Sequence, residues 1–196
     1  MTAADYLVDI VLTVFITFGI YQFYFWCQRN TRTAPRELST FLDDKIPFRP
    51  GWVWIYSGLY YPLIIYGNFC MDSPREFGRA AMSFIALLFA HMLIFTFFPV
   101  ATPEHWRHYH PQRGLSERFL AFVHSFDARS NCFPSMHTSV AVLIAGLIQG
   151  HTGPWAWAFP VLIGVSCLYT KQHFIVDLPA GAALGWAAYR FFEHIR

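Results

Sequence analysis

The chain has few charged residues and no recognisable metal or disulfide pattern. Only 13% of its 196 residues are charged, whereas 55% are hydrophobic and 19% aromatic. Soluble domains are about a quarter charged, so this is the composition of a membrane protein, with a length that suits one domain. A net charge of +2 is too small to predict nucleic-acid binding. The four cysteines lack CxxC spacing, so neither a zinc site nor a disulfide framework is predicted.

The N-terminal segment also lacks the features of a cleaved signal peptide. Asp5 and Asp9 stand where a basic leader is expected, and no small-residue cleavage site directly follows the apolar run. The run is also too long for a signal peptide. We therefore expect the first hydrophobic segment to remain in the mature protein.

Six hydrophobic segments predict an all-α, integral membrane bundle of six transmembrane helices in a single domain, residues 1–196. The first segment supplies about the 20 apolar residues that cross a bilayer. Gly181 and Gly185 have the small-xxx-small spacing that lets two membrane helices approach closely. The predicted spans are residues 6–27, 52–69, 79–100, 135–150, 154–169 and 178–192.

The segments between the spans are polar and carry most of the cations. Residues 37–46 suggest a short interfacial helix, and residues 101–133 form the longest predicted loop. The odd-numbered loops share one side and hold most Lys and Arg, which the positive-inside rule would place in the cytoplasm. Because several of these cations are candidates for substrate binding, the charge count leaves the orientation open.

Two short segments place histidines beside predicted helix starts on the same side. In Asn131-Cys-Phe-Pro-Ser-Met-His137, Ser135 is a natural N-cap, and His137 falls in the first helical turn. A capping serine needs no further role, but a helix N-terminus also binds phosphate through its free N–H groups and dipole. We expect Ser135 to contact a phosphate.

The second segment, Lys171-Gln-His173-Phe-Ile-Val-Asp177, pairs a histidine with a carboxylate four residues later. Asp177 is also a plausible helix cap before Pro179, and a cap alone needs no histidine nearby. Together, His173 and Asp177 match a carboxylate that orients an imidazole and stabilises its cation.

The other histidines have simpler explanations. His91 stands alone within the third predicted span, where a hydrogen-bonded packing role is favoured. His105, His108 and His110 form a run, but no carboxylate pattern completes a metal site. We predict no metal and no cofactor.

The two histidine segments together resemble a known family. Pro134-Ser135-Met136-His137 and His173-x3-Asp177 resemble the second and third motifs of the type 2 phosphatidic acid phosphatase superfamily. The wider strings at 127–138 and 170–181, and Ile46-Pro-Phe-Arg-Pro50, are most similar to the branch that includes inositol-phosphoceramide and sphingomyelin synthases. The resemblance covers about residues 40–190.

The resemblance implies a phosphohistidine mechanism without a metal. His173 would attack the phosphorus, Asp177 would orient it, and His137 would protonate the leaving alcohol. His137 would then activate water, or a second alcohol, to release the phosphoryl group. Members of the family usually act on the extracytoplasmic face, which implies a periplasmic or lumenal site.

The chain departs from the family pattern at the phosphate-binding cations. The first motif, Lys-x6-Arg-Pro, is absent, because Leu42 stands at the lysine position before Arg49-Pro50. The Ser-Arg pair of the third motif falls on Ser166-Cys167. We expect the phosphate to be bound instead by a set of replacement residues: Ser135, Asn131, Lys171, Arg107 and Arg49.

The leading functional hypothesis is a membrane lipid phosphatase that hydrolyses a lipid phosphate or pyrophosphate. The first alternative is a lipid phosphotransferase that moves a phospho-headgroup to an alcohol such as a sphingolipid or diacylglycerol. The second is a non-catalytic lipid transporter or assembly factor. The expected partners are a lipid phosphate substrate and membrane lipids, while the headgroup and the oligomeric state cannot be read from the sequence.

Overall fold

Helices make up all the regular structure in the described part of the chain. The computed structural model describes residues 1–107 and 114–195, and no strand occurs within these ranges. A single bridge between Arg36 and Val100 joins two loops. The prediction of an all-α chain is therefore confirmed.

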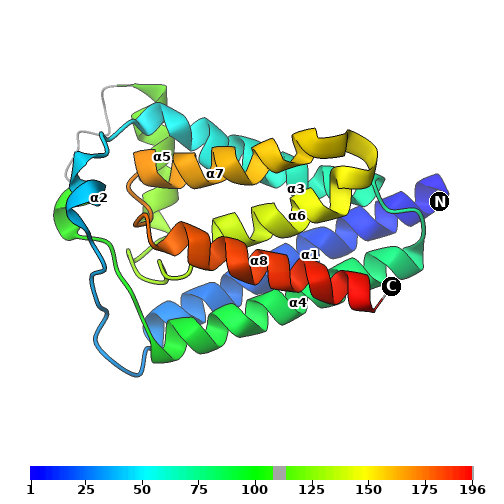
Figure 1. Ribbon diagram of the computed structural model, residues 1–196, viewed down its shortest axis with the longest axis horizontal. Coiled ribbons are helices and arrows are strands. Elements are labelled where there is room, and N and C mark those ends of the chain that lie inside the picture. The colour runs from blue at the N-terminus through cyan, green and yellow to red at the C-terminus, as the bar shows by residue number, and fades with distance from the viewer. Residues whose placement is uncertain (108–113, 196) are drawn as a thin grey trace.

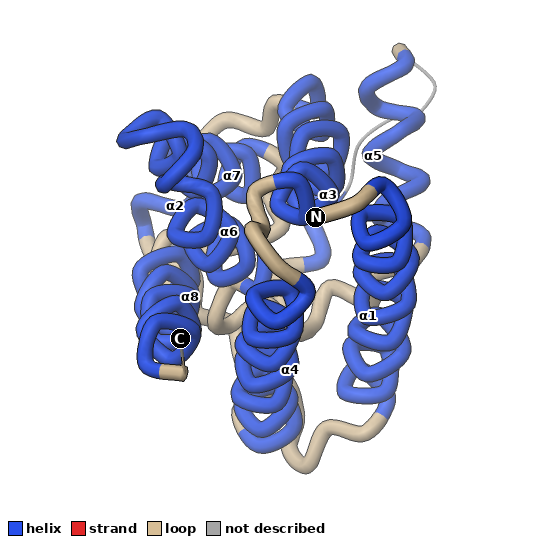
Figure 2. Tube along the Cα trace, turned by 90° about the vertical axis from the view of Figure 1, so that its right-hand side faces the viewer, coloured by secondary structure: helices blue, strands red, loops and turns tan. Residues whose placement is uncertain are grey.

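Two long helices, α1 (Ala3–Arg29) and α4 (Pro74–Phe97), lie side by side along the molecule (Figures 1 and 2). Among the described residues, these two are long and apolar enough to cross a membrane. Each begins at a clear cap: Thr2 forms a capping box with Asp5, and Ser73 accepts a hydrogen bond from the Glu76 N–H. The cap at Ser73 starts α4 earlier than the predicted residue 79.

Helix α6 (Met136–Thr152) is the central helix of the bundle. Its residues from Thr138 to Gly146 are all buried. Around it pack α3 (Tyr60–Phe69), α7 (Ala158–Tyr169) and α8 (Asp177–His194), as Figure 1 shows. The histidine segments therefore lie at one end of the best-packed part of the molecule.

Four predicted segments differ in detail from the observed helices. The segment at 52–69 is divided into a π-helix, Trp54–Leu59, and α3, while 154–169 begins with a 3₁₀ turn before α7. The predicted loop at 101–133 contains α5 (Leu115–Ser125), and the predicted interfacial helix shortens to α2 (Phe41–Lys45).

Close contact between α6 and α8 fixes the relative position of the two histidine segments. A Cβ atom built on Gly181 would lie 2.4 Å from the carbonyl oxygen of Ser135, and one on Gly185 would lie 2.2 Å from that of Ser139. No side chain fits at such distances, so the predicted close approach of Gly181 and Gly185 to a neighbouring helix is confirmed.

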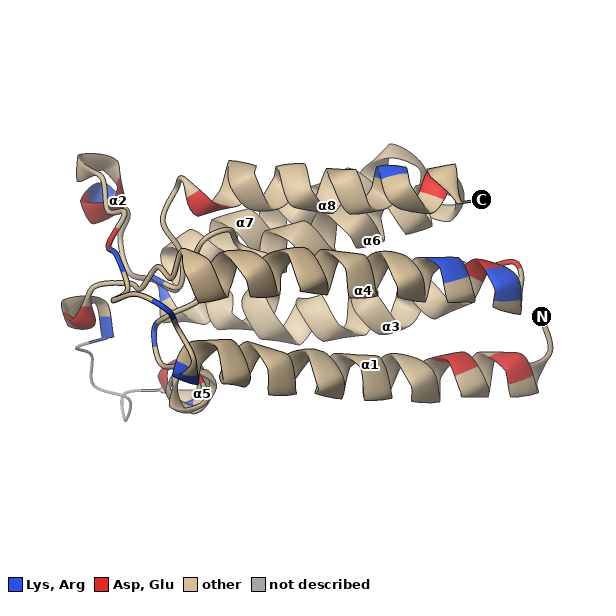
Figure 3. Ribbon diagram, turned by 90° about the horizontal axis from the view of Figure 1, so that it is seen from below, with Lys and Arg blue, Asp and Glu red and all other residues tan. Residues whose placement is uncertain are grey.

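Charged residues lie toward the two ends of the long helices (Figure 3). On α8, for example, Asp177 lies at one end, and Arg190 and Glu193 at the other. The middle sections of the helices carry none, and large apolar side chains such as Phe15 and Phe89 are more than 60% exposed there. This exterior suits hydrocarbon better than water.

Candidate active site

The N-termini of α6 and α8 meet at one end of the bundle. The backbone N–H of Ser135 donates to the carbonyl oxygen of Asp177 at 3.1 Å. The loops that precede these helices contain every described non-glycine residue with positive φ, namely Arg129, Asn131 and Lys171. Such backbone strain persists where the surrounding structure enforces it, and it clusters at functional sites.

His173 is held in a defined orientation by two acceptors. Its Nδ1 lies 2.8 Å from the carbonyl oxygen of Cys132 and 3.2 Å from Oδ2 of Asp177. A carbonyl oxygen can only accept, so Nδ1 carries the proton and Nε2 has a free lone pair. The tautomer is therefore the one that a nucleophile needs at Nε2.

Asp177 is fully buried, and the backbone holds it in place. Its Oδ2 also accepts a hydrogen bond from the Phe174 N–H at 2.8 Å. A second carboxylate supports the loop from outside: Oδ1 of Asp43 accepts from the Ile175 N–H at 2.7 Å. The short loop that carries His173 is thus fixed from both sides.

His137 is held by aromatic rings rather than by a carboxylate. Its ring stacks on Tyr56 with centroids 4.2 Å apart and lies 4.7 Å from the ring of Tyr60. The Tyr56 hydroxyl lies 3.3 Å from His137 Nδ1. Tyr56 belongs to the π-helix Trp54–Leu59, a type of distortion that is frequent at functional sites.

The two histidines face the same cavity. Their ring centroids are 6.2 Å apart, and both line a cavity of about 590 Å³ between α1, α3, α4, α5 and α6. The end near the histidines also holds Tyr24, Tyr56 and Asn131, whereas side chains such as Ile64, Phe84 and Ile144 line the remainder. The cavity is therefore polar around the histidine pair and largely apolar elsewhere.

Of the two motif residues expected to bind phosphate, one lines this cavity. Asn131 does so from a left-handed backbone conformation, and its Nδ2 donates to the carbonyl oxygen of Tyr24 at 2.9 Å. Ser135 is fully buried and caps α6, where its Oγ accepts from the Thr138 N–H at 3.3 Å and from the Thr138 hydroxyl at 3.1 Å.

The three expected cations lie outside the cavity, which no described Lys or Arg lines. The Lys171 amine donates to the Asp43 carbonyl oxygen at 2.7 Å and lies 4.5 Å from the centre of the Trp106 ring. Burial lowers the pKa of Lys171, and the carboxylates of Asp44 and Asp43 oppose that shift. Lys171 thus helps to fix the loop that carries His173 against the Asp43 segment.

The other two cations have different environments. Arg107 forms an ion pair with Asp127, with Nη2 and Oδ2 2.6 Å apart, and its Nη2 also lies 3.5 Å from Oε1 of Gln172, which lines the cavity. The Arg49 side chain is exposed. Of the three cations, Arg107 is the one connected to the cavity, through Asp127 and Gln172, which both line it.

Sequence reasoning missed the residues that support the histidines. Tyr56 and Tyr60 are four positions apart, as expected for one helix face, but aromatic residues are so common in this chain that the spacing carried little signal. Asp43 is buried and bonded to a segment far along the chain, which no local pattern predicts.

A metal site is not indicated. Among the described residues, no group of three His, Cys, Asp or Glu side chains is placed to hold an ion. His105 is exposed, while His108 and His110 lie outside the described residues.

Comparison with known proteins identifies the family. A family model described as the PAP2 superfamily matches residues 33–191, a region that contains both histidine segments but not α1. No curated protein and no solved structure matches the chain. The resemblance is therefore confirmed for the superfamily: the chain belongs to the PAP2 superfamily.

Proposed function

We propose that this protein is an integral membrane lipid phosphatase that acts through a phosphohistidine on His173. Membership of the PAP2 superfamily indicates phosphatase- or phosphotransferase-type chemistry. The observation that carries the proposal is the pairing of His173 with His137 across one cavity, with Asp177 bound to His173. A lipid phosphate matches this cavity, because its charged group needs the polar end and its chain the apolar remainder.

In the first half of the reaction, Nε2 of His173 attacks the phosphorus, and the bond between phosphorus and the lipid oxygen breaks. His137 donates a proton to the leaving oxygen, which departs as the alcohol. The imidazole gains positive charge as it forms the N–P bond, and Asp177 stabilises that charge from the other side of the ring.

In the second half, water attacks the phosphohistidine. His137, now neutral, accepts a proton from the water as the O–P bond forms, and the N–P bond breaks to restore His173. Inorganic phosphate leaves, and His137 is again protonated for the next cycle. Nucleophile, acid and orienting carboxylate are all side chains, so we propose that no metal is required.

We propose that the phosphoryl oxygens meet Asn131 and the N-terminal turn of α6, where Ser135 is the cap. The helix dipole favours an anion there. Arg107 would act through Gln172, since its guanidinium lies 3.5 Å from that side chain. Lys171 and Arg49 would contribute positive potential from outside the cavity.

We further propose a six-span arrangement with the histidine end on the extracytoplasmic, periplasmic or lumenal, face. The charge-free middle sections of the helices and the exposed apolar side chains support a bundle surrounded by lipid. The choice of face rests on the family resemblance. The face can be tested with vesicles that hold the protein in one known orientation and receive a membrane-impermeant phosphate ester from outside. We expect phosphate release when the extracytoplasmic face of the protein points outward.

The direct test is phosphate release by the purified protein in detergent. The panel would contain phosphatidic acid, phosphatidylglycerophosphate, isoprenyl phosphates and sphingolipid phosphates. We expect release from at least one of them, unchanged by EDTA, and none by His173→Ala. His151→Ala serves as a control, because this exposed residue lies at the C-terminal end of α6. Equal release by His173→Ala and the wild type would contradict the proposal.

A lipid phosphotransferase is the second candidate, supported by the resemblance of both histidine segments to the inositol-phosphoceramide and sphingomyelin synthase branch. Here an alcohol replaces water in the second half of the reaction. Product analysis separates the two: free phosphate without any added alcohol indicates hydrolysis, whereas strict dependence on an acceptor such as diacylglycerol indicates transfer. Absence of both products would favour the non-catalytic alternative.

A further inference from the structure

Helix α1 lies outside the part of the chain that the PAP2 family model matches, yet it forms one wall of the cavity that contains both histidines. Its inner face contributes residues along much of its length. The principal ones are Thr13, Ile16, Thr17, Ile20, Tyr21 and Tyr24.

Several bonds fix the position of α1 relative to the histidines. The carbonyl oxygen of Tyr24 accepts from Asn131 Nδ2 at 2.9 Å, and Gln28 Nε2 donates to Asp127 at 2.9 Å. Tyr24 and Gln28 thus connect α1 to the loop that precedes α6. These contacts hold the end of α1 near Tyr24 beside the polar end of the cavity.

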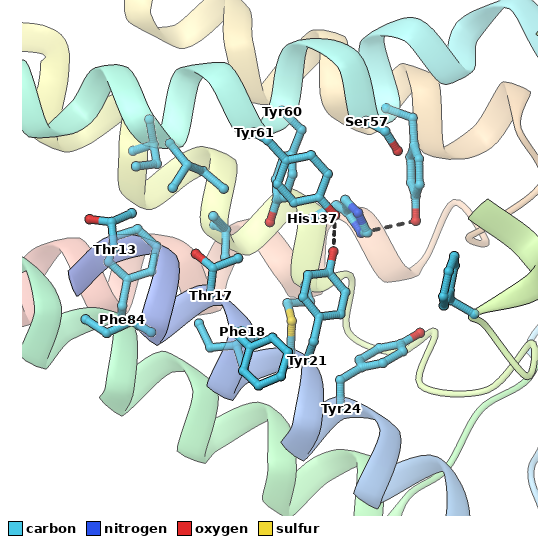
Figure 4. A pocket seen from close by; sticks show the side chains of 18 of the residues that line it. Thr13, Thr17, Phe18, Tyr21, Tyr24, Ser57, Tyr60, Tyr61, Phe84 and His137 are labelled. Atoms are coloured by element: carbon cyan, nitrogen blue, oxygen red, sulfur yellow. Dashed lines mark hydrogen bonds between the residues drawn. The ribbon is translucent and has the colours of Figure 1, made fainter. Parts of the chain in front are cut away.

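Further from the histidines, α1 is joined to the helix that faces it across the cavity. The hydroxyls of Tyr21 and Tyr61 are hydrogen-bonded (Figure 4). Beyond them, the Thr13 hydroxyl donates to Asn68 Oδ1 at 2.8 Å. The inner face of α1 therefore runs from the histidines into the bundle in a fixed register, while residues such as Val14 and Phe15 are exposed on its outer face.

The length of this wall matches one leaflet of a bilayer. Positions 13 and 24 are separated by about 16 Å along a helix that rises about 1.5 Å per residue. Half of a hydrocarbon core about 30 Å thick is about 15 Å. A lipid chain whose phosphate lies at the histidines would thus extend along α1 to the level of Thr13.

We propose that α1 determines which hydrocarbon chains this protein accepts. The chain of the substrate lies against Ile20, Thr17 and Thr13 in turn, so these side chains set the length that fits. This inference rests on the proposed function. It assigns chain selection to a helix that the family match does not include.

The test places a tryptophan at successive levels of the wall. Thr17→Trp fills the middle of the cavity, whereas Ile20→Trp fills it nearer the histidines. Val14→Trp is the matched control, because Val14 lies on the same helix, is 54% exposed and does not line the cavity. Phosphate release is measured for alkyl phosphates of increasing chain length.

We expect Thr17→Trp to retain activity on short chains and lose about tenfold or more on long ones. Each methylene kept out of the cavity weakens binding by a factor of about four. Ile20→Trp should impose the limit at a shorter chain, and Val14→Trp should behave as the wild type. The preserved activity on short chains shows that the variants fold.

Two outcomes would overturn the inference alone: an unchanged chain-length profile in both cavity variants, or an equal loss at every chain length while Val14→Trp remains active. A wild-type protein that releases phosphate from no lipid phosphate would overturn the proposed function, and this inference with it.

Discussion

The two histidines lie in one cavity but are held by different groups. His173 has a carboxylate and a carbonyl oxygen at its Nδ1, while His137 lies between two tyrosine rings with a neutral hydroxyl at its Nδ1. A carboxylate favours an imidazole that gains positive charge. A tyrosine hydroxyl both donates and accepts, so it tolerates either protonation state.

This difference supports the proposed division of roles between the two histidines. In the proposed mechanism His173 becomes a phosphorylated imidazolium, and the Asp177 carboxyl group at its Nδ1 lies where it can stabilise that charge. A residue that first donates and then accepts a proton needs a partner that adapts, as His137 has.

The largest effect is expected from His173→Ala. Without the proposed nucleophile no phosphohistidine forms, and the rate of phosphate release should fall by more than about 10⁴-fold. Incubation with a ³²P-labelled substrate, followed by an alkaline quench, should show no labelled protein. Labelled protein in this variant would show that the covalent bond forms on another residue, and the roles proposed for His173 and His137 would then be wrong.

His137→Ala should lose less, and by an amount that depends on the leaving group. Loss of a general acid lowers the rate about 10²- to 10⁴-fold when the leaving group is an alcohol. When the leaving group is a phenol, which departs without a proton, the first step should lose little of its rate. The second step still lacks its base, so labelled phosphohistidine should accumulate. Equal losses with alkyl and aryl phosphates, without accumulation, would contradict the acid role.

Gly185→Ala should affect both histidines together. The new Cβ would lie 2.2 Å from the Ser139 carbonyl oxygen, so α6 and α8 must separate. We expect a loss of about 1–3 kcal/mol in the free energy of unfolding and reduced rates for alkyl and aryl phosphates alike. Gly150→Ala is the control, since a Cβ there meets nothing within 4 Å; a loss of the same size in both would argue against a specific contact.

Tyr56→Phe should have a smaller and more selective effect. It keeps the ring against His137 but removes the hydroxyl at Nδ1, a hydrogen bond of about 1 kcal/mol and therefore a rate loss of about fivefold. The pH profile of the rate should shift, because the protonation of His137 changes. Tyr60→Phe is the matched control, because it also keeps its ring against His137 and loses only its hydroxyl. Identical pH profiles for the two variants would show that Tyr56 does not position His137.

The sequence predicted the parts of the site that depend on local spacing. His173 lies in the short loop before α8, and Asp177, four residues later, is the first residue of that helix. Gly181 and Gly185 lie one helical turn apart, so short-range geometry was enough for both pairs. The support for His137 comes from another helix, and Asp43 reaches Ile175 across most of the chain. Such pairings follow from tertiary packing.

The cations and α5 illustrate the same limit. Lys171 precedes His173 by two residues, yet its amine bonds to the Asp43 carbonyl oxygen, and Lys171 does not line the cavity. Helix α5 has apolar residues at Leu115, Phe119 and Phe122, but the polar stretch before it and the histidines around it favoured a loop prediction. Side-chain direction and the packing of a short helix both depend on neighbours that are remote in sequence.

The smallest effect concerns the stability of the fold in acid. Burial, together with Arg107, lowers the pKa of His124 in α5 to about 3. The unfolded chain binds this proton below pH about 6.5 but the folded protein does not, so stability is present above that pH and is lost as the pH falls toward 3. His124→Gln should flatten the dependence of Tm on pH, by up to about 1.4 kcal/mol per pH unit in unfolding free energy, and leave the rate at pH 7.5 unchanged. Parallel Tm curves for the variant and the wild type would mean that other groups cause the loss of stability in acid.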